Sequence, residues 1–192
     1  IGIAAVKNSY SKSEGVTVDY VDPADIVYSH TESPYFEDLY YVGEIKTMPI
    51  NELAKQFPHL TNEDLKNIQD QGGKQYHGTG NKIYTDDRRK DNNLVQVLYF
   101  NYKTYMNEVY KTKITATGAN KSIERDDQYK PPADSEEFGI LSRSLEVLYD
   151  GVMILGTDII LKWELCKNMM RPKSDSTKVK MNYSIVAPRM YK

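Results

Sequence analysis

The stretch that decides the fold covers residues 16–57 and reads VTVDYVDPADIVYSHTESPYFEDLYYVGEIKTMPINELAKQF. Apolar and polar residues alternate over residues 16–21, which is the period of a half-buried β-strand. Pro23 has a fixed φ and no backbone N–H, so this strand is predicted to end at Asp22. An acidic loop follows, and then the pattern predicts a second strand over residues 39–47 and a short helix over residues 51–57.

Turn residues predict three hairpins. The first pairs residues 3–6 with residues 16–21 around Ser13-Glu14-Gly15, because Gly15 can supply the positive φ that such a turn needs. The second pairs residues 94–105 with residues 109–115, with its turn at Met106-Asn107-Glu108. The third joins residues 144–149 and 152–155 through Asp150-Gly151, a dipeptide typical of two-residue turns.

The remaining elements complete an α+β fold of mostly antiparallel β hairpins with two short helices. Thr61 is the predicted N-cap of the second helix, which ends near Gln69, and residues 158–165 and 179–186 are further strands. Residues 71–93 and 117–139 are polar and are predicted to be loops. We interpret residues 1–192 as a single β-rich unit with possible sub-parts 1–70 and 94–192, joined by the polar loop 71–93.

Composition limits the possible functions. The 192 residues carry a formal net charge of −2, so no overall basic field attracts nucleic acid. A single cysteine, Cys166, excludes an intrachain disulfide, and no apolar run reaches the length of about 18 residues that a membrane span needs. The chain begins at Ile1 in strand-like sequence and ends at Lys192 without a stop signal. We therefore expect an internal fragment of a longer protein.

No set of residues predicts catalysis. His30, His59 and His77 lie far apart, and none has a second ligand at the spacing of a zinc site. Gly78-Thr79-Gly80 lacks the strand–helix context of a dinucleotide fingerprint and the ending of a P-loop. The acidic pairs Asp126-Asp127 and Glu136-Glu137 are interpreted as hydrated loop residues, with a divalent cation bound by one of them as the alternative.

Two further residues receive structural interpretations. Cys166 lies beside Lys167 but near no histidine, so it is interpreted as a half-buried structural thiol at the end of a strand. Trp163 is interpreted as a core or inter-sheet anchor. We therefore predict a protein that is not an enzyme and has no catalytic residue, metal site or cofactor.

Several residues in this order form a wider pattern. An apolar strand ends in Val21-Asp22-Pro23, an acidic loop follows, an aromatic strand carries Gly43-Glu44, and a helix ends in Phe57-Pro58. The C-terminal part adds residues 145–155, Trp163, Arg171-Pro172 and Ala187-Pro188-Arg189. This pattern resembles the portal proteins of tailed bacteriophages, and most of all those of the crAss-like gut phages. It extends over most of the chain as turns and aromatic residues, without a motif that is diagnostic alone.

The resemblance implies a structural virion component. Portal subunits form a ring, typically dodecameric, at one capsid vertex, and double-stranded DNA is packaged and ejected through its channel. The implied partners are other portal subunits, the capsid protein, the terminase and the tail adaptor, with assembly in the host bacterial cytoplasm and no membrane. A β-rich segment with two short helices corresponds to the wing-like region, while residues 94–115 could instead reach towards the motor and the tail. The long stem helices of the family are missing, so they would lie outside this chain.

One loop is a predicted protein interface. Tyr35, Phe36, Glu37 and Asp38 place aromatic rings beside carboxylates, which suits contact with protein better than contact with phosphates. We expect this loop to face a neighbouring subunit or the capsid protein. The other possibility is that Tyr35 and Phe36 fold back onto the chain's own core.

Two other classes of function remain open. A β-rich phage tail, adhesin or carbohydrate-binding module would use tyrosines such as Tyr99 and Tyr102 as a ligand platform. That class requires aromatic residues on one exposed face, whereas the sequence distributes its 16 tyrosines over all the predicted strands. An enzyme of unknown class would need convergent titratable groups, and the sequence offers no such set.

Overall fold

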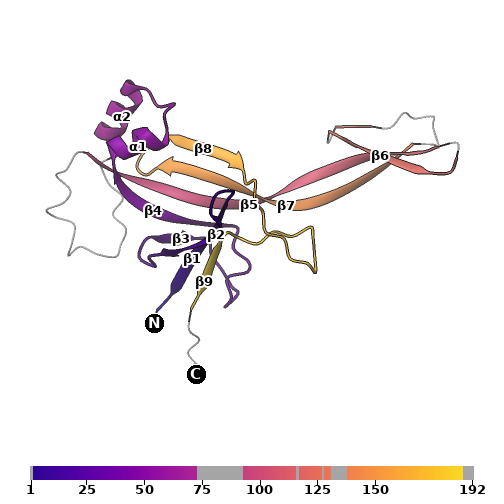
Figure 1. Cartoon of the computed structure of the whole chain (residues 1–192), viewed down its shortest axis with the longest axis horizontal. Helices are drawn as coiled ribbons and strands as arrows, with labels where there is room; N and C mark the ends of the chain where they lie inside the picture. Colours follow the sequence, from indigo (N-terminus) through magenta and orange to yellow (C-terminus); the bar gives the residue numbers. More distant parts are fainter. Residues whose placement is uncertain (1, 73–92, 116, 127, 131–137, 188–192) are drawn as a thin grey trace.

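The computed structural model describes residues 2–72, 93–115, 117–126, 128–130 and 138–187 (Figure 1). Two antiparallel sheets and two short helices make up the described residues, which confirms the α+β class with mostly antiparallel β structure. The smaller sheet has the strand order β2-β1-β9, and the larger sheet has the order β3-β4-β5-β7-β8 with β6 paired to β5. The predictions for residues 73–92, including His77 and Gly78-Thr79-Gly80, lie outside the described residues.

The smaller sheet contains the predicted N-terminal hairpin. This sheet consists of β1 (Ala4–Ser11), β2 (Gly15–Val21) and β9 (Tyr183–Val186). Gly15 has a φ of 78°, as the turn requires. The strand ends before Pro23 as predicted, and the Ala24 N–H donates to the Asp22 carboxylate over 2.9 Å in the turn that follows.

The larger sheet is built around two long strands. Its members are β3 (Ile26–Tyr28), β4 (Tyr41–Pro49), β5 (Leu94–Ile114), β6 (Asn120–Arg125), β7 (Phe138–Ile154) and β8 (Ile160–Leu165). The predicted alternation along β5 is confirmed, because Val95, Val97 and Asn101 are buried on one face. The polar stretch 117–139 was predicted to be a loop, but it contains the exposed edge strand β6.

The predicted turn at Met106-Asn107-Glu108 is wrong. These residues continue β5 and pair with Leu145, Ser144 and Arg143 of β7. None of the three is a glycine or proline, so nothing in the sequence interrupts a strand once β7 provides a partner. The two segments predicted as one hairpin are therefore parts of a single strand, β5. The strand that pairs with them is β7, which begins more than 20 residues after the end of β5.

The predicted turn at Asp150-Gly151 is also wrong. Both residues lie within β7, opposite Asn101 and Phe100 of β5. A Cβ at position 151 would lie 2.3 Å from Cζ of Phe100, so the glycine leaves room for an aromatic ring. This close approach, and not a turn, explains the glycine.

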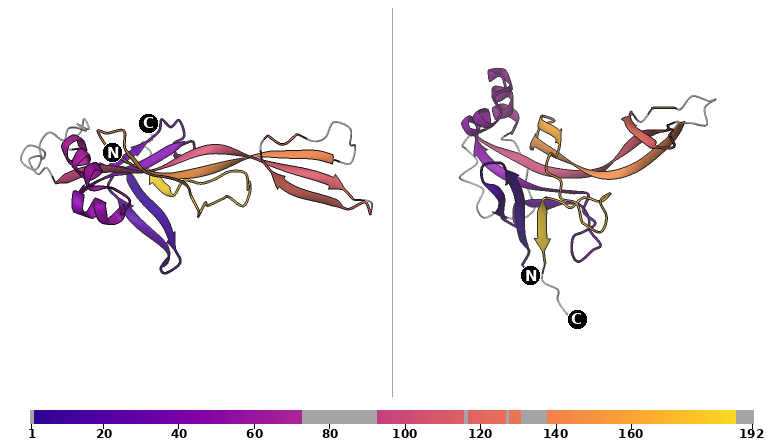
Figure 2. Two further views of the ribbon diagram at one scale, coloured as in Figure 1. Left: turned by 90° about the horizontal axis from the view of Figure 1, so that it is seen from above. Right: turned by 45° about the vertical axis from the view of Figure 1, so that its right-hand side comes forward.

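The strands β5 and β7 extend well beyond the rest of the sheet. β4 pairs with β5 only as far as Tyr102, and β8 pairs with β7 only from Tyr149. Past these points the two strands form a twisted ribbon that carries β6 near its end (Figures 1 and 2). We call the described residues 103–126 and 138–148 the arm.

Both predicted helices are confirmed. They are α1 (Ile50–Gln56) and α2 (Asn62–Gly72). Thr61 and Asp64 form a reciprocal cap, in which the Thr61 N–H donates to the Asp64 carboxylate over 3.0 Å and the Asp64 N–H donates to Thr61 Oγ1 over 3.2 Å.

Two main apolar clusters hold the body of the molecule together. The helices bury Leu53 and Ile68 against the larger sheet, where Val97 and Ile154 are fully buried. The second cluster lies where the smaller sheet meets β4. Its buried members are Ala5, Val21, Leu39, Val42, Tyr183 and Ile185. The second cluster therefore joins the two sheets. No helix within the described residues is both long and apolar enough to span a membrane.

Candidate functional site

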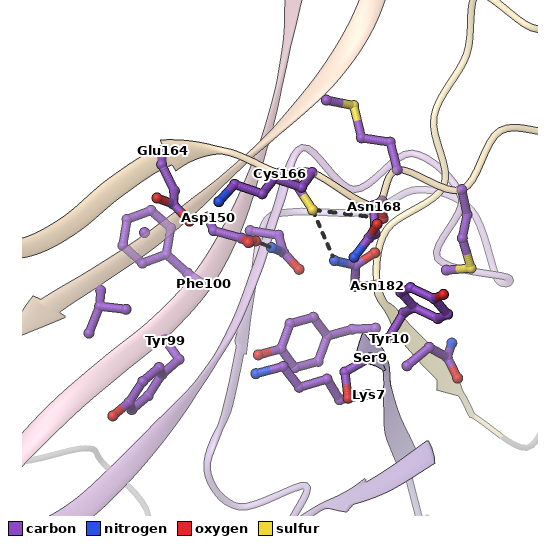
Figure 3. Close-up of a pocket in the computed structure, with 18 of the residues that line it drawn as sticks. Lys7, Ser9, Tyr10, Tyr99, Phe100, Asp150, Glu164, Cys166, Asn168 and Asn182 are labelled. Atoms are coloured by element: carbon purple, nitrogen blue, oxygen red, sulfur yellow. Dashed lines mark hydrogen bonds between the residues drawn. The ribbon is translucent and has the colours of Figure 1, made fainter. Parts of the chain in front are cut away.

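A cleft of about 730 Å³ lies between the two sheets. β1 of the smaller sheet lines one side, β5, β7 and β8 line the other, and the segment after β8 completes it (Figure 3). The side chains that lie within it come from strands distant in sequence, so the fold and not a local motif creates the cleft.

A buried carboxylate beside the cleft joins the two sheets. Glu44 of β4 is only 5 % exposed, and its Oε1 lies 2.9 Å from Nζ of Lys7 in β1 and 3.2 Å from Nζ of Lys46. The hydroxyl of Tyr183 in β9 donates to the same oxygen over 3.5 Å. Glu44 therefore links the larger sheet to two strands of the smaller one, by an ion pair with Lys7 of β1 and a hydrogen bond from Tyr183 of β9.

This network shifts the pKa values of its members. Burial raises the pKa of the Glu44 carboxyl, but the hydrogen bond and charge of Lys7, together with Lys46, outweigh burial and hold that pKa below its ordinary value. Burial, and then the charge of Glu44, raise the pKa of the Tyr183 hydroxyl far above its ordinary range. Tyr99, whose ring lies 5.8 Å from Nζ of Lys7, also has a raised pKa, mainly because of burial. Both tyrosines therefore stay neutral.

The floor of the cleft carries an amide–carboxylate pair. Asn101 and Asp150 are opposite each other on β5 and β7, and the Asn101 Nδ2 donates to the Asp150 carboxylate. Asn101 is 4 % exposed, and no residue of the described chain donates to its Oδ1. Glu164 of β8 is opposite Asp150, so a row of oxygen acceptors crosses this side of the cleft.

Cys166 lies at the edge of the cleft and is buried. Its Sγ lies 3.8 Å from the Asn168 carbonyl and 3.6 Å from Nδ2 of Asn182 (Figure 3). The thiol also packs against Leu148 and Val179. Its position directly after β8 is the predicted strand end, but the residue is buried and not half-buried as predicted.

The opposite face of the larger sheet presents a continuous aromatic surface. Strand register places Val27, Gly43, Phe100, Gly151 and Trp163 in one row across five strands. The next row contains Tyr41, Tyr102 and Tyr149, and the Tyr40 ring lies 6.4 Å from that of Tyr102. We call this surface the aromatic face. Its aromatic members are Tyr40, Tyr41, Phe100, Tyr102, Tyr149 and Trp163.

The prediction that Trp163 anchors the core is wrong. Trp163 is 49 % exposed and stacks on Tyr149 with the ring centroids 5.2 Å apart. The pairing of β7 with β8 shifts register between Val152 and Met153. Because of this irregularity the side chain of Leu161 packs into the core, whereas that of Trp163 does not. Trp163 therefore belongs to the aromatic face.

The loop predicted as an interface divides into inward and outward parts. The Phe36 ring packs on the cluster around Leu39 and makes an edge contact with Tyr28 at 5.6 Å, whereas Tyr35 is 64 % exposed. Glu37 is exposed as well. Phe36 therefore folds back onto the chain's own core and Tyr35 does not, while the contact with a neighbouring subunit or the capsid protein stays a prediction.

Asp38 holds this loop together. Its carboxylate accepts hydrogen bonds from the Thr31 hydroxyl and from the backbone N–H groups of Glu32 and Ser33. The Thr31 hydroxyl, followed by the Glu32 N–H, lowers the pKa of Asp38 to about 2. The Asp38 carboxylate is therefore engaged within the loop, while Tyr35 and Glu37 remain on its surface.

The described residues contain no group of three or more His, Cys, Asp or Glu side chains that could hold a metal ion. His30 and His59 are exposed in different loops, as is Asp126. Asp127, Glu136 and Glu137 lie outside the described residues.

Neither the acceptor row nor the aromatic face was predicted from the sequence. Each depends on strand register, which was predicted incorrectly for β5 and β7. One signal was present, because Gly43 and Gly151 are glycines within apolar strand patterns and such positions indicate close packing.

The chain matches no protein-family model, and a search of curated proteins finds no significant match.

Proposed function

We propose that this chain is a peripheral, wing-like segment of a phage portal protein. The proposal rests on the resemblance carried by Val21-Asp22-Pro23, Gly43-Glu44 and Phe57-Pro58. It also rests on the arm that projects from the body of the molecule. Its role is structural: the chain contributes to a ring at the capsid vertex through which double-stranded DNA passes. The proposal assigns this chain no chemical step, no cofactor and no metal.

The arm is the observation that carries this proposal. Its strands project from the body, and the outer edge of β6 has no partner strand among the described residues. Several apolar side chains on the arm are exposed, including Tyr105 at 70 % and Leu141 at 59 %. Exposed apolar groups on an extended ribbon are typical of surfaces that pack against another protein chain.

In this proposal the arm contacts the neighbouring subunit of a dodecameric ring. Tyr35 and Glu37 form a second contact, to a neighbouring subunit or to the capsid protein. The terminase and the tail adaptor are partners of the whole ring, which functions in the virion. The channel wall is formed by other parts of the portal protein, since the described residues contain only two short helices.

Native mass spectrometry of the longer protein containing this chain tests the proposal. We expect a closed ring, and we expect Leu141→Asp and Ile123→Asp to weaken it, because both substitutions place a charge on the arm. Val18→Asp is the matched control, because Val18 is equally exposed but lies on β2. A longer protein that stays monomeric would contradict the portal proposal. A ring unaffected by both arm variants would remove the arm from the interface.

The 192-residue chain alone should be a monomer by light scattering, because the expected ring contacts need the rest of the protein.

The aromatic face favours a second candidate, a carbohydrate-binding module. Strand register gathers on one surface aromatic residues of β4, β5, β7 and β8 that lie far apart in the sequence. Trp163 and Tyr102 are its exposed centre, whereas Tyr99 lies on the other face and its hydroxyl donates to Gln56 over 2.7 Å. Aromatic rings offer flat apolar area to the C–H face of a sugar.

A glycan array tests this candidate. Reproducible binding that Trp163→Ala and Tyr102→Ala abolish, and that Tyr105→Ala on the arm leaves intact, would support it. Binding that survives all three changes would exclude the aromatic face as the platform.

A further inference from the structure

One face of the arm is basic near the tip. The pairing of β5 with β6 and with β7 aligns three strands there, and side chains two positions apart along a strand share a face. Three adjoining rows of this face carry four basic residues, and these described rows contain no carboxylate. The rows are Arg125-Val109-Ser142, Ile123-Lys111-Ile140 and Lys121-Lys113-Phe138. We call this surface the basic face of the arm.

Exposed apolar side chains lie among these charges. Ile123 and Ile140 stand on either side of Lys111 in the middle row, and they are 55 % and 44 % exposed. Lys121 and Arg125 form no ion pair with a carboxylate of the described residues. The basic face therefore combines exposed apolar area with a positively charged border.

The isoleucines favour a protein over a nucleic acid as the partner. Phosphate groups attract lysine and arginine, but they offer no apolar contact to Ile123 and Ile140. A protein surface that is apolar at its centre and acidic at its border would match both features of the basic face.

The aromatic face on the body of the molecule has such an apolar centre. Three adjoining rows across the larger sheet contain no charged residue among the described positions. These rows are Ile45-Leu98-Met153-Ile160, Val27-Gly43-Phe100-Gly151-Trp163 and Tyr41-Tyr102-Tyr149-Leu165. A hollow of about 200 Å³ lies at Gly43, between Val27, Leu98 and Phe100. An aliphatic side chain such as isoleucine fits a hollow with this lining.

The loop between β3 and β4 supplies the acidic border. Residues 29–40 connect these strands and so border one end of the aromatic face, to which the last of them, Tyr40, belongs. The Tyr40 ring lies 6.4 Å from that of Tyr102. Glu32 and Glu37 are exposed in this loop, which contains no lysine or arginine.

The two surfaces can meet only between copies of the chain. β6 and the tip of the arm lie at the opposite end of the molecule from β4 and β8, so the arm does not reach its own aromatic face (Figures 1 and 2). We propose that the basic face of the arm in one subunit binds the aromatic face and the 29–40 loop of the next subunit. A head-to-tail contact of this kind joins two different surfaces, and it generates a ring when the rotation closes. The inference rests on the proposed function, in which the arm contacts the neighbouring subunit, and it names the surface that receives the arm.

Nuclear magnetic resonance of the ¹⁵N-labelled 192-residue chain tests this contact outside any ring. We expect a weak contact between isolated chains, so that they are monomeric at micromolar concentration and associate at millimolar concentration. The indole N–H signal of Trp163, the single tryptophan, should then shift together with the backbone N–H signals of Ile123 and Glu37. The signals of β2 should stay constant.

Charge reversal tests which surfaces meet. Lys121→Glu/Arg125→Glu makes the arm acidic, and Glu32→Lys/Glu37→Lys makes the loop basic. Each variant alone should associate about tenfold more weakly or less, because like charges then face each other. An equal mixture of the two variants should restore association, because the acidic arm of one meets the basic loop of the other and the two unchanged surfaces also match.

A matched control separates this contact from an effect of net charge. Lys55→Glu/Lys66→Glu changes the net charge as much as Lys121→Glu/Arg125→Glu does, at exposed positions on α1 and α2. It should leave the association unchanged.

Three outcomes would overturn the inference. In the first, no signal of the arm or the aromatic face depends on the concentration of the chain. In the second, the mixture of the two charge-reversed variants associates no better than either alone. In the third, a short DNA duplex shifts the Ile123 signal and a second copy of the chain does not, which would assign the basic face to phosphates.

These outcomes are distinct from a failure of the portal proposal. A closed ring in native mass spectrometry, with no charge-dependent contact between the isolated chains, would keep the portal proposal and reject this interface. A contact that the mixture restores, without any closed ring, would keep the interface and reject the portal.

Discussion

The ring of Phe100 lies directly over Gly151 on the neighbouring strand. A Cβ at position 151 would stand 2.3 Å from Cζ, 2.6 Å from Cε1 and 2.8 Å from Cε2 of that ring. On the other neighbouring strand, β4, a Cβ at Gly43 would lie 2.6 Å from the Tyr99 carbonyl oxygen and 2.7 Å from Cβ of Phe100. Gly151 therefore leaves room for the Phe100 ring, which contacts Trp163 in the aromatic face, and Gly43 leaves room for the backbone and Cβ at that position.

Gly151→Ala should destabilise the chain by about 1–3 kcal/mol, because the added methyl group meets the Phe100 ring. Thermal unfolding followed by circular dichroism measures the change. The double variant Gly151→Ala/Phe100→Ala should show no further penalty from the alanine at 151 relative to Phe100→Ala alone. Equal penalties from Gly151→Ala with and without the Phe100 ring would contradict the contact as the cause.

Glu44→Gln should cost more stability than Glu164→Gln. Glu44 is buried and pairs with Lys7, whose side chain is 27 % exposed, whereas both partners of the Lys162–Glu164 pair are exposed. Removing one member of a largely buried pair leaves the other charge uncompensated, for which we expect about 1–3 kcal/mol, whereas solvent screens the exposed pair and its loss should cost clearly less. Urea denaturation of both variants measures the difference. Equal costs would show that Glu44 does not link the sheets.

The same carboxylate predicts a pH dependence. The pKa of Glu44 is lower in the folded chain than its ordinary value of 4.5, so the unfolded chain takes up the proton first as the pH falls. Its stabilising effect is complete at neutral pH and is lost below about pH 4.5 as the folded pKa is approached. The stability difference between the original chain and Glu44→Gln should therefore shrink on acidification. A difference that stays constant from pH 7 to pH 3 would contradict this assignment.

Much of the body could be predicted from local signals, and the arm could not. Pro23, Gly15 and the Thr61–Asp64 cap act on neighbouring residues, so the first hairpin and both helices were predicted correctly. The pairing of β5 with β7 joins residues far apart in the chain, and no turn residue announces it. Asp150-Gly151 was misleading because a glycine that admits an aromatic ring looks the same in sequence as one that forms a turn. Asn101, Asp150 and Trp163 came together only through that register.

Tyr35→Ser and Phe36→Ser should have different effects. Phe36 packs on Tyr28 and the cluster around Leu39, so Phe36→Ser should lower the melting temperature of the chain by several degrees. Tyr35 is mostly exposed, so Tyr35→Ser should leave the melting temperature within about 1 °C. If the loop is an interface, Tyr35→Ser should instead weaken assembly of the longer protein, as measured by its sedimentation. Unchanged assembly would remove Tyr35 from the interface.

Cryo-electron microscopy of the complete portal protein that the proposal requires tests the central claim most directly. The portal proposal predicts a closed ring in which this chain lies at the periphery, with Ile123 and Leu141 of each arm buried against the next subunit. A particle without a ring, or a ring in which the arms stay exposed and this chain lines the channel, would contradict it.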